Sequence, residues 1–199
     1  FRAIWDGRAE NDSFNRLVLG ARLGWKDIAL LRAYARYMKQ IRFGISENYI
    51  ADTLSRYIPI SAQIVNLFHA RFGLSDQSSD ERSKAVAEVE GQIHEALDSV
   101  DQLNEDRAIR RYIELIKATL RTNYFQPDAE GKPKSYLSFK IKPSEITDIP
   151  LPRPMFEIFV YSPRIEGVHL RGGKVARGGL RWSDRVDDFR TEVLGLVKA

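Results

Sequence analysis

The chain has 199 residues, 43% of them hydrophobic, and a formal net charge of +4. This length and hydrophobic content are enough for one sizeable core or two small units. It contains no cysteine, which excludes disulfide scaffolds, thiolate catalysis and Cys-based metal sites. Because no apolar run reaches the roughly 18 residues that span a membrane, and Phe1 opens no signal-peptide pattern, we expect a cytoplasmic protein outside the membrane.

Residues 1–124 carry apolar side chains at helical spacing and are predicted to form an all-helical subdomain. Six helices are expected: one capped by Asp12 or Ser13 with Phe14, Leu17 and Val18 inward, one from about Lys26 to Gly44, one capped by Ser46 with Tyr49, Ile50 and Leu54 inward, one from Pro59 to Gly73, one over 81–98, and one over 104–122 that includes Leu120. His69 and His94 lie inside these helices without a partner at metal-ligand spacing. We therefore expect structural histidines and no metal site.

From Asn123 onward the apolar period changes from helical to two, which is typical of strands. Strands are expected over 136–142, 155–161, 165–170 and 177–182, with a proline-rich excursion over 143–154. A helix capped by Ser183 or Asp184 follows, with Phe189, Val193, Leu196 and Val197 inward. The sequence thus predicts an α+β fragment divided into a helical linker or interface subdomain, 1–124, and the start of an α/β substrate-binding domain, 125–199.

The positive charge of the chain is concentrated in its glycine-rich part. Between Arg164 and Arg185 there are six basic residues and only two acidic ones, Glu166 and Asp184, so this segment carries a net charge of +4. The remaining residues hold equal numbers of acidic and basic side chains. A local positive field of this kind favours an anionic ligand, although a solvated basic loop would look the same.

The same segment contains two Arg-Gly-Gly units, Arg171–Gly173 and Arg177–Gly179. Their spacing matches neither a dinucleotide-binding fingerprint nor a phosphate-binding P-loop. Three interpretations follow: a substrate-carboxylate site made by arginine and backbone amides, a nucleic-acid segment, or a structural turn. The nucleic-acid interpretation is the weakest, since the units lie between strand-like apolar runs and no array of base-stacking aromatic residues accompanies them.

Two nearly continuous stretches, residues 172–185 and 188–199, resemble the NAD-specific glutamate dehydrogenases of the large-subunit bacterial class. The resemblance implies that the parent protein oxidatively deaminates L-glutamate to 2-oxoglutarate and ammonia while reducing NAD. It also implies a homo-oligomer, with neither nucleic acid nor membrane as a partner. The helical half is similar, more weakly, to the linker that joins the regulatory part of those enzymes to the catalytic core, and we expect it to couple the two.

The resemblance assigns four substrate-binding residues on the last predicted strand. Arg177 lies where glutamate dehydrogenases commonly carry a lysine that holds a substrate carboxylate, and an arginine can bind a carboxylate through two hydrogen bonds. Gly178 and Gly179 match the paired glycines against which the substrate lies. Arg181 matches the motif arginine, for which a structural ion pair is an equal alternative.

No catalytic, cofactor-binding or metal-binding residue is predicted within these 199 residues. In the family, a further substrate-binding lysine, the catalytic lysine and the NAD-binding domain follow this helix, and Lys198 lies in no glycine turn. We therefore expect the isolated fragment to be inactive. The alternative function is a non-enzymatic helical interaction module with a basic Arg-Gly-Gly segment that binds an anion or RNA.

Overall fold

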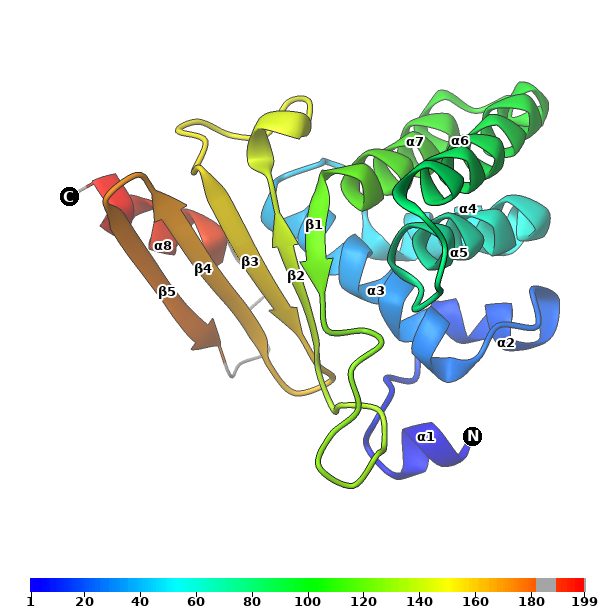
Figure 1. The fold of residues 1–199 in the computed structure, drawn as a ribbon, viewed down its shortest axis with the longest axis horizontal. Coiled ribbons are helices and arrows are strands. Elements are labelled where there is room, and N and C mark those ends of the chain that lie inside the picture. The colour runs from blue at the N-terminus through cyan, green and yellow to red at the C-terminus, as the bar shows by residue number, and fades with distance from the viewer. Residues whose placement is uncertain (182–188, 199) are drawn as a thin grey trace.

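A computed structural model describes residues 1–181 and 189–198, so the predicted end of the last strand at Trp182 and the predicted caps Ser183 and Asp184 lie outside the described residues. Helices build the N-terminal part, and a five-stranded antiparallel sheet with one further helix follows (Figure 1). This arrangement confirms the predicted α+β class. The division at residue 124 remains a prediction.

Several helical elements of the N-terminal part begin at a side-chain cap. Its helices are α1 (Arg2–Trp5), α2 (Leu17–Gly20), α3 (Trp25–Gln40), α4 (Glu47–Arg56), α5 (Ile58–Phe72), α6 (Ser79–Ala96) and α7 (Leu103–Ala118), with short 3₁₀ turns at Ser13–Arg16 and Leu97–Ser99. The Asp12 side chain accepts from the Phe14 N–H, and Ser46 accepts from the Tyr49 N–H, as expected of N-caps. Ser78 and Glu81 form a capping box at α6.

The sheet is a simple meander in which every strand pairs with its neighbours in the chain. Its order is β1 (Thr119–Thr122), β2 (Leu137–Ile141), β3 (Phe156–Tyr161), β4 (Glu166–Gly172) and β5 (Val175–Arg181), and a 3₁₀ turn at Pro143–Glu145 lies between β2 and β3. The β4–β5 hairpin turns at Gly173, whose φ of 67° suits glycine at the first position of a two-residue hairpin turn. β5 is therefore an edge strand.

The prediction of a helix over 104–122 is wrong in its last turn. Helix α7 ends at Ala118, and the next four residues form β1, with Thr122 opposite Phe139 of β2. β-Branched threonines at both ends favour extended backbone, and the Lys142 N–H donates to the Ala118 carbonyl at 2.9 Å, closing the helix onto the sheet. Pairing with β2, which lies further along the chain, therefore determines that these four residues form a strand.

Three side chains that were predicted to point inward are exposed instead: Val18, Tyr49 and Leu196. Val18 belongs to a helix of only four residues, α2, which presents little more than Leu17 to the core. Tyr49 and Leu196 lie at the borders of otherwise buried stripes on α4 and α8 (Phe189–Lys198). A helical stripe read from sequence fixes the buried face but not its width.

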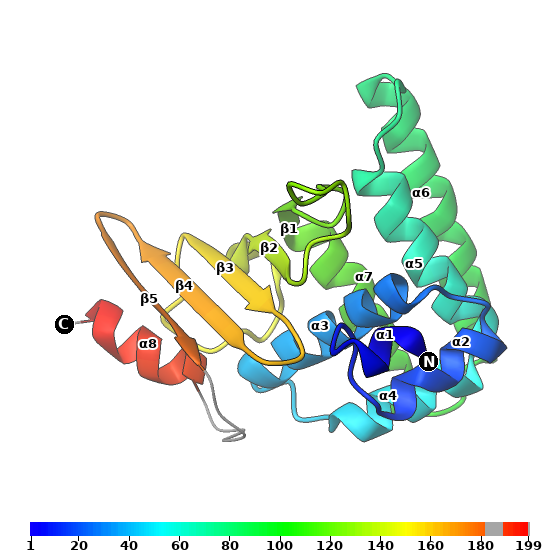
Figure 2. The ribbon, with the colours of Figure 1, turned by 90° about the horizontal axis from the view of Figure 1, so that it is seen from below.

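Helices α3 and α8 lie on the same side of the sheet (Figure 2). Ring centroids of Tyr34 and Phe139 lie 4.8 Å apart, and those of Tyr37 and Phe159 lie 5.4 Å apart, so α3 packs directly on β2 and β3. Helix α8 packs on β4 and β5. One continuous core therefore joins the helical part to the sheet.

Candidate functional site

Strand β5 presents alternate residues to the side of the sheet that α8 covers. Arg177 pairs with Leu170 of β4, which pairs with Glu157 of β3, so these three positions share one face. Gly179 lies two residues further along on the same face. A Cβ atom built on Gly179 would lie 3.3 Å from the Phe189 ring of α8, so the ring would have to shift by a few tenths of an ångström to admit a side chain.

Gly178 is glycine for a different packing reason. A Cβ atom at this position would lie 2.8 Å from the Val168 carbonyl oxygen and 2.9 Å from the His169 Cα, closer than side chains tolerate. The adjacent glycines thus bring β5 close to β4 through Gly178 and close to α8 through Gly179. They fix the place of the strand that carries Arg177.

Arg177 is an exposed cation on this strand. Its Nη1 donates to the neighbouring Ala176 carbonyl oxygen at 3.0 Å, and it makes no ion pair with any residue in the ranges 1–181 and 189–198. A guanidinium in this state keeps most of its five donors for a ligand. Arg177 is thus an exposed guanidinium on the edge strand, with donors left over after its bond to Ala176.

Arg181 lies opposite Glu166 in the β4–β5 register and is half-buried. The Glu166 carboxylate accepts from Gln40 Nε2 at 2.9 Å and lies 3.8 Å from Arg36. Opposite charges therefore face each other across two neighbouring strands. This environment is the one that the ion-pair interpretation of Arg181 requires.

Helix α8 is tied to β3 by a buried ion pair between Arg190 and Glu157. The Arg190 Nε lies 3.0 Å from Oε2 of Glu157, a second guanidinium nitrogen bonds Oε1, and both side chains are 1% exposed. Burial opposes the charge of Arg190, but its bonds to Glu157 outweigh burial and raise its pKa. Removing either partner would leave a buried charge without compensation.

Tyr37 of α3 completes this buried cluster. Its hydroxyl donates to Oε2 of Glu157 at 2.7 Å. Burial, together with the neighbouring carboxylate, raises the pKa of Tyr37 well above its usual value. The sequence analysis did not identify this cluster, because Glu157 alternates like any outward strand residue and its partners lie 33 and 120 residues away.

One signal for this cluster was present in the sequence of α3. Arg32, Arg36 and Gln40 recur every four residues in a helix that is otherwise mostly apolar, which places three long polar side chains on one face. Arg32 and Gln40 are nevertheless buried. Polar residues at helical spacing within a core helix indicate a buried polar contact as often as a solvated face.

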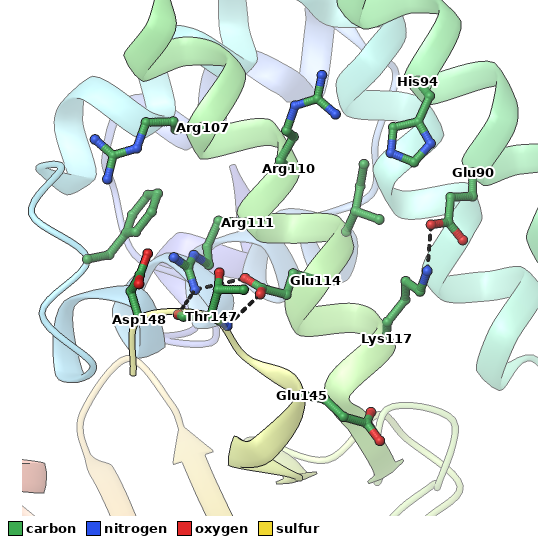
Figure 3. A pocket seen from close by; sticks show the side chains of 12 residues that line it. Glu90, His94, Arg107, Arg110, Arg111, Glu114, Lys117, Glu145, Thr147 and Asp148 are labelled. Atoms are coloured by element: carbon green, nitrogen blue, oxygen red, sulfur yellow. Dashed lines mark hydrogen bonds and ion pairs between the residues drawn. The ribbon is translucent and has the colours of Figure 1, made fainter. Parts of the chain in front are cut away.

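A second feature is a groove of about 670 Å³ between α6, α7 and the turn before Asp148 (Figure 3). Four of its charged side chains pair with one another: Arg111 lies 2.8 Å from Glu114, and Lys117 lies 2.6 Å from Glu90. Glu114 also accepts from the Thr147 N–H at 2.6 Å. The Glu114–Thr147 bond joins the β2–β3 excursion to α7, and the Lys117–Glu90 pair joins α7 to α6, so the groove lies between three packed elements and has balanced lining charge.

Of the two helical histidines, His69 lies in a structural contact, and His94 is an exposed side chain on the lining of the groove. The His69 Nε2 lies 2.8 Å from Oδ1 of Asp27, which also accepts from the Tyr124 hydroxyl at 2.7 Å. Burial disfavours the Asp27 carboxylate, but these hydrogen bonds outweigh it and lower its pKa. Within the described ranges no three His, Asp or Glu side chains gather as a metal site would require.

No helix in the part of the chain that the structure describes is both long and apolar enough to cross a lipid bilayer. The antiparallel meander also contains no parallel βαβ unit among its described strands, which is the unit that binds dinucleotides. In the described part of the chain, the glycine-rich edge strand β5 carries the exposed Arg177, and a buried ion pair ties the helix packed on that strand to β3.

The chain consists of helices that lead into a glycine-rich strand and a further helix. Two family profiles of glutamate dehydrogenases match it. The profile "Bacterial NAD-glutamate dehydrogenase, catalytic domain" matches residues 92–199, and "Glutamate dehydrogenase, helical motif 3" matches residues 9–74. The chain belongs to the bacterial NAD-glutamate dehydrogenase family.

Three curated relatives, each called NAD-specific glutamate dehydrogenase, align along the chain. The protein of Halomonas elongata is 59% identical over 199 residues, that of Pseudomonas aeruginosa is 60% identical over 200, and that of Mycobacterium tuberculosis is 48% identical over 200. The alignments cover 99–100% of this chain but only 12% of each relative. The name of these relatives gives NAD as their coenzyme, and the chain spans about an eighth of their length.

Proposed function

We propose that this chain is a segment of a longer NAD-dependent glutamate dehydrogenase that converts L-glutamate to 2-oxoglutarate and ammonia. Within it, β5 supplies one wall of the substrate-carboxylate site. The observation that carries this proposal is the state of Arg177: an exposed guanidinium without an ion-pair partner among residues 1–181 and 189–198, on a strand fixed by two glycines. Family membership supports the reaction class.

In this proposal the four residues act differently. Arg177 binds a substrate carboxylate by charge-assisted hydrogen bonds, which orient the substrate and neutralise its charge. Gly178 and Gly179 hold β5 against β4 and α8 and leave its backbone accessible beside the substrate. Arg181 faces Glu166 and stabilises the strand end. The coenzyme oxidises the substrate, and we assign it no residue of this chain.

The nucleic-acid alternative has less support from the geometry. Arg171 pairs with Ala176 and Arg177 pairs with Leu170, so the arginines of the two Arg-Gly-Gly units lie on opposite faces of the hairpin. A nucleic-acid backbone would need them on one surface. Both units also belong to ordered strands. We further propose, from family membership, that the longer protein is a cytoplasmic homo-oligomer.

The test is steady-state kinetics of the longer enzyme with Arg177→Ala. We expect kcat/KM for glutamate to fall by about 10- to 100-fold, the range for a lost charge-assisted contact, while KM for NAD stays within about twofold. Arg177→Lys should recover part of the loss. Arg171→Ala removes an arginine of the same hairpin on the opposite face and serves as the control. Equal kinetics for the two alanine variants would remove Arg177 from the site.

A further inference from the structure

The polar stripe of α3 reaches three separate parts of the molecule. Arg32 bonds Asp12 near the N-terminus, with Nη2 2.7 Å from Oδ1. One turn later, Arg36 lies 2.9 Å from Glu10. Gln40, at the end of the helix, reaches the sheet and α8. The stripe therefore connects the first residues of the helical part to the elements that surround β5.

Gln40 is the residue of the stripe that contacts both β4 and α8. Its Oε1 accepts from the Arg190 backbone N–H at 3.0 Å, and its Nε2 donates to Oε2 of Glu166 at 2.9 Å. The side chain is buried, with 6% of the residue exposed. The carboxamide of Gln40 accepts from an N–H group and donates to a carboxylate at the same time, which neither a carboxylate nor an ammonium group at this position could do.

The Arg190 N–H is one of the first amides of α8, which lack partners within the helix. Gln40 therefore caps the beginning of α8 from another helix, at a sequence distance of 150 residues. The bond ties the first described turn of α8 to α3, and the Arg190–Glu157 ion pair ties the same turn to β3. Together they hold α8 against the sheet.

The position of α8 in turn sets the surface around Arg177. Phe189, the residue before the capped amide, lies against Gly179, and Val197 lies against Gly172 at the other end of the hairpin. Arg177 projects from β5 between these two contacts, on the same face of the sheet. A displacement of α8 would change the space available beside the guanidinium.

We infer that Gln40 is a positioning residue for the glutamate site, acting through α8 on the β5 wall. The inference rests on the proposed function of Arg177. Gln40 connects the helical part to the substrate wall indirectly, through β4 and α8. Gln40 touches neither substrate nor coenzyme, so its effect is on substrate binding through the place of α8.

The test uses the longer enzyme with Gln40→Met, which keeps the size of the side chain and removes both hydrogen bonds. We expect KM for glutamate to rise about three- to tenfold, KM for NAD to stay within about twofold, and backbone amides at the start of α8 to exchange hydrogen faster. Lys39→Ala is the matched control, because it shortens the adjacent, partly exposed α3 side chain that contacts Glu47 and not α8. It should leave all three values unchanged.

A double variant separates the bridge from general packing. Gln40→Glu alone retains an acceptor for the Arg190 N–H but sets a carboxylate against Glu166. Adding Glu166→Gln exchanges the amide and the carboxylate, restoring a donor and an acceptor across the contact at the same net charge. We expect Gln40→Glu to raise KM for glutamate and the exchanged pair to return it to within about twofold of the wild-type value.

Two results would overturn the inference. One is an unchanged KM for glutamate in Gln40→Met while Arg177→Ala raises it. The other is a parallel rise of both KM values with a lower melting temperature, which is general destabilisation. If Arg177→Ala has no effect, the proposed function fails separately, and hydrogen exchange in α8 still reports whether Gln40 holds that helix.

Discussion

Arg190 and Arg177 belong to the neighbouring elements α8 and β5, yet their environments are opposite. Arg190 is fully buried and bonded to Glu157. Arg177 is exposed and, among residues 1–181 and 189–198, is bonded only to the carbonyl of the residue before it. The contrast indicates two different roles: the buried arginine holds the helix in place, and the exposed one is available for an anion. Replacing the first should therefore change stability, and replacing the second should change kinetics.

The largest effect is expected from Arg190→Met. Because Glu157 would remain buried without its partner, the free energy of local opening around β3 and α8 should fall by about 3–5 kcal/mol. Hydrogen exchange of peptides from both elements in the longer protein measures this quantity. Combining it with Glu157→Met should recover much of the loss. An Arg190→Met variant with wild-type exchange would show that the buried ion pair does not hold α8.

Gly178→Ala should have a smaller effect on the hairpin. The added Cβ would lie 2.8 Å from the Val168 carbonyl oxygen, so β4 and β5 must separate, at a cost of about 1–3 kcal/mol. Exchange of β4 and β5 amides should increase. The matched control is Gly91→Ala in α6, where a Cβ atom meets nothing within 4 Å and should stabilise the helix by up to about 1 kcal/mol. Equal effects at both positions would contradict the packing role of Gly178.

A still smaller, pH-dependent effect is expected from Tyr37. Folding raises its pKa, so the buried phenol stays neutral while the phenol of the unfolded chain ionises near pH 10. Its contribution to stability is complete below about pH 10 and is lost as the pH rises toward the folded-state pKa, by up to about 1.4 kcal/mol per pH unit. The melting temperature of Tyr37→Phe should therefore fall less steeply between pH 10 and 11 than that of the unchanged protein. Identical slopes would contradict the role of Tyr37.

Local sequence signals were sufficient for the longer helices and for β2 to β5, whereas the four-residue α1 was not predicted and α7 is shorter than predicted. Ser46 and the Pro59-to-Gly73 segment mark helix ends by their own chemistry, and the period-two pattern marks β3. Strand β1 could not be predicted in this way, because Thr119–Thr122 becomes a strand only through pairing with β2. Family resemblance, with the charge pattern, pointed to Arg177.

The buried contacts between α3, β3 and α8 could not be predicted from local sequence for the same physical reason. Glu157, Arg190 and Gln40 are each ordinary polar residues in their own segments, and only the packing of α3 and α8 on one face of the sheet brings them together. Their spacing within the chain carries no signal of the contact. The four-residue recurrence in α3 gave the face but not the partners.

The most direct test of these two roles is to measure stability and kinetics together in Arg177→Met of the longer enzyme. The account predicts that hydrogen exchange of β5 and α8 changes by less than about 0.5 kcal/mol, since Arg177 is exposed, while kcat/KM for glutamate falls by about 10- to 100-fold. A variant that loses stability in both elements and keeps its kcat/KM for glutamate would contradict the account.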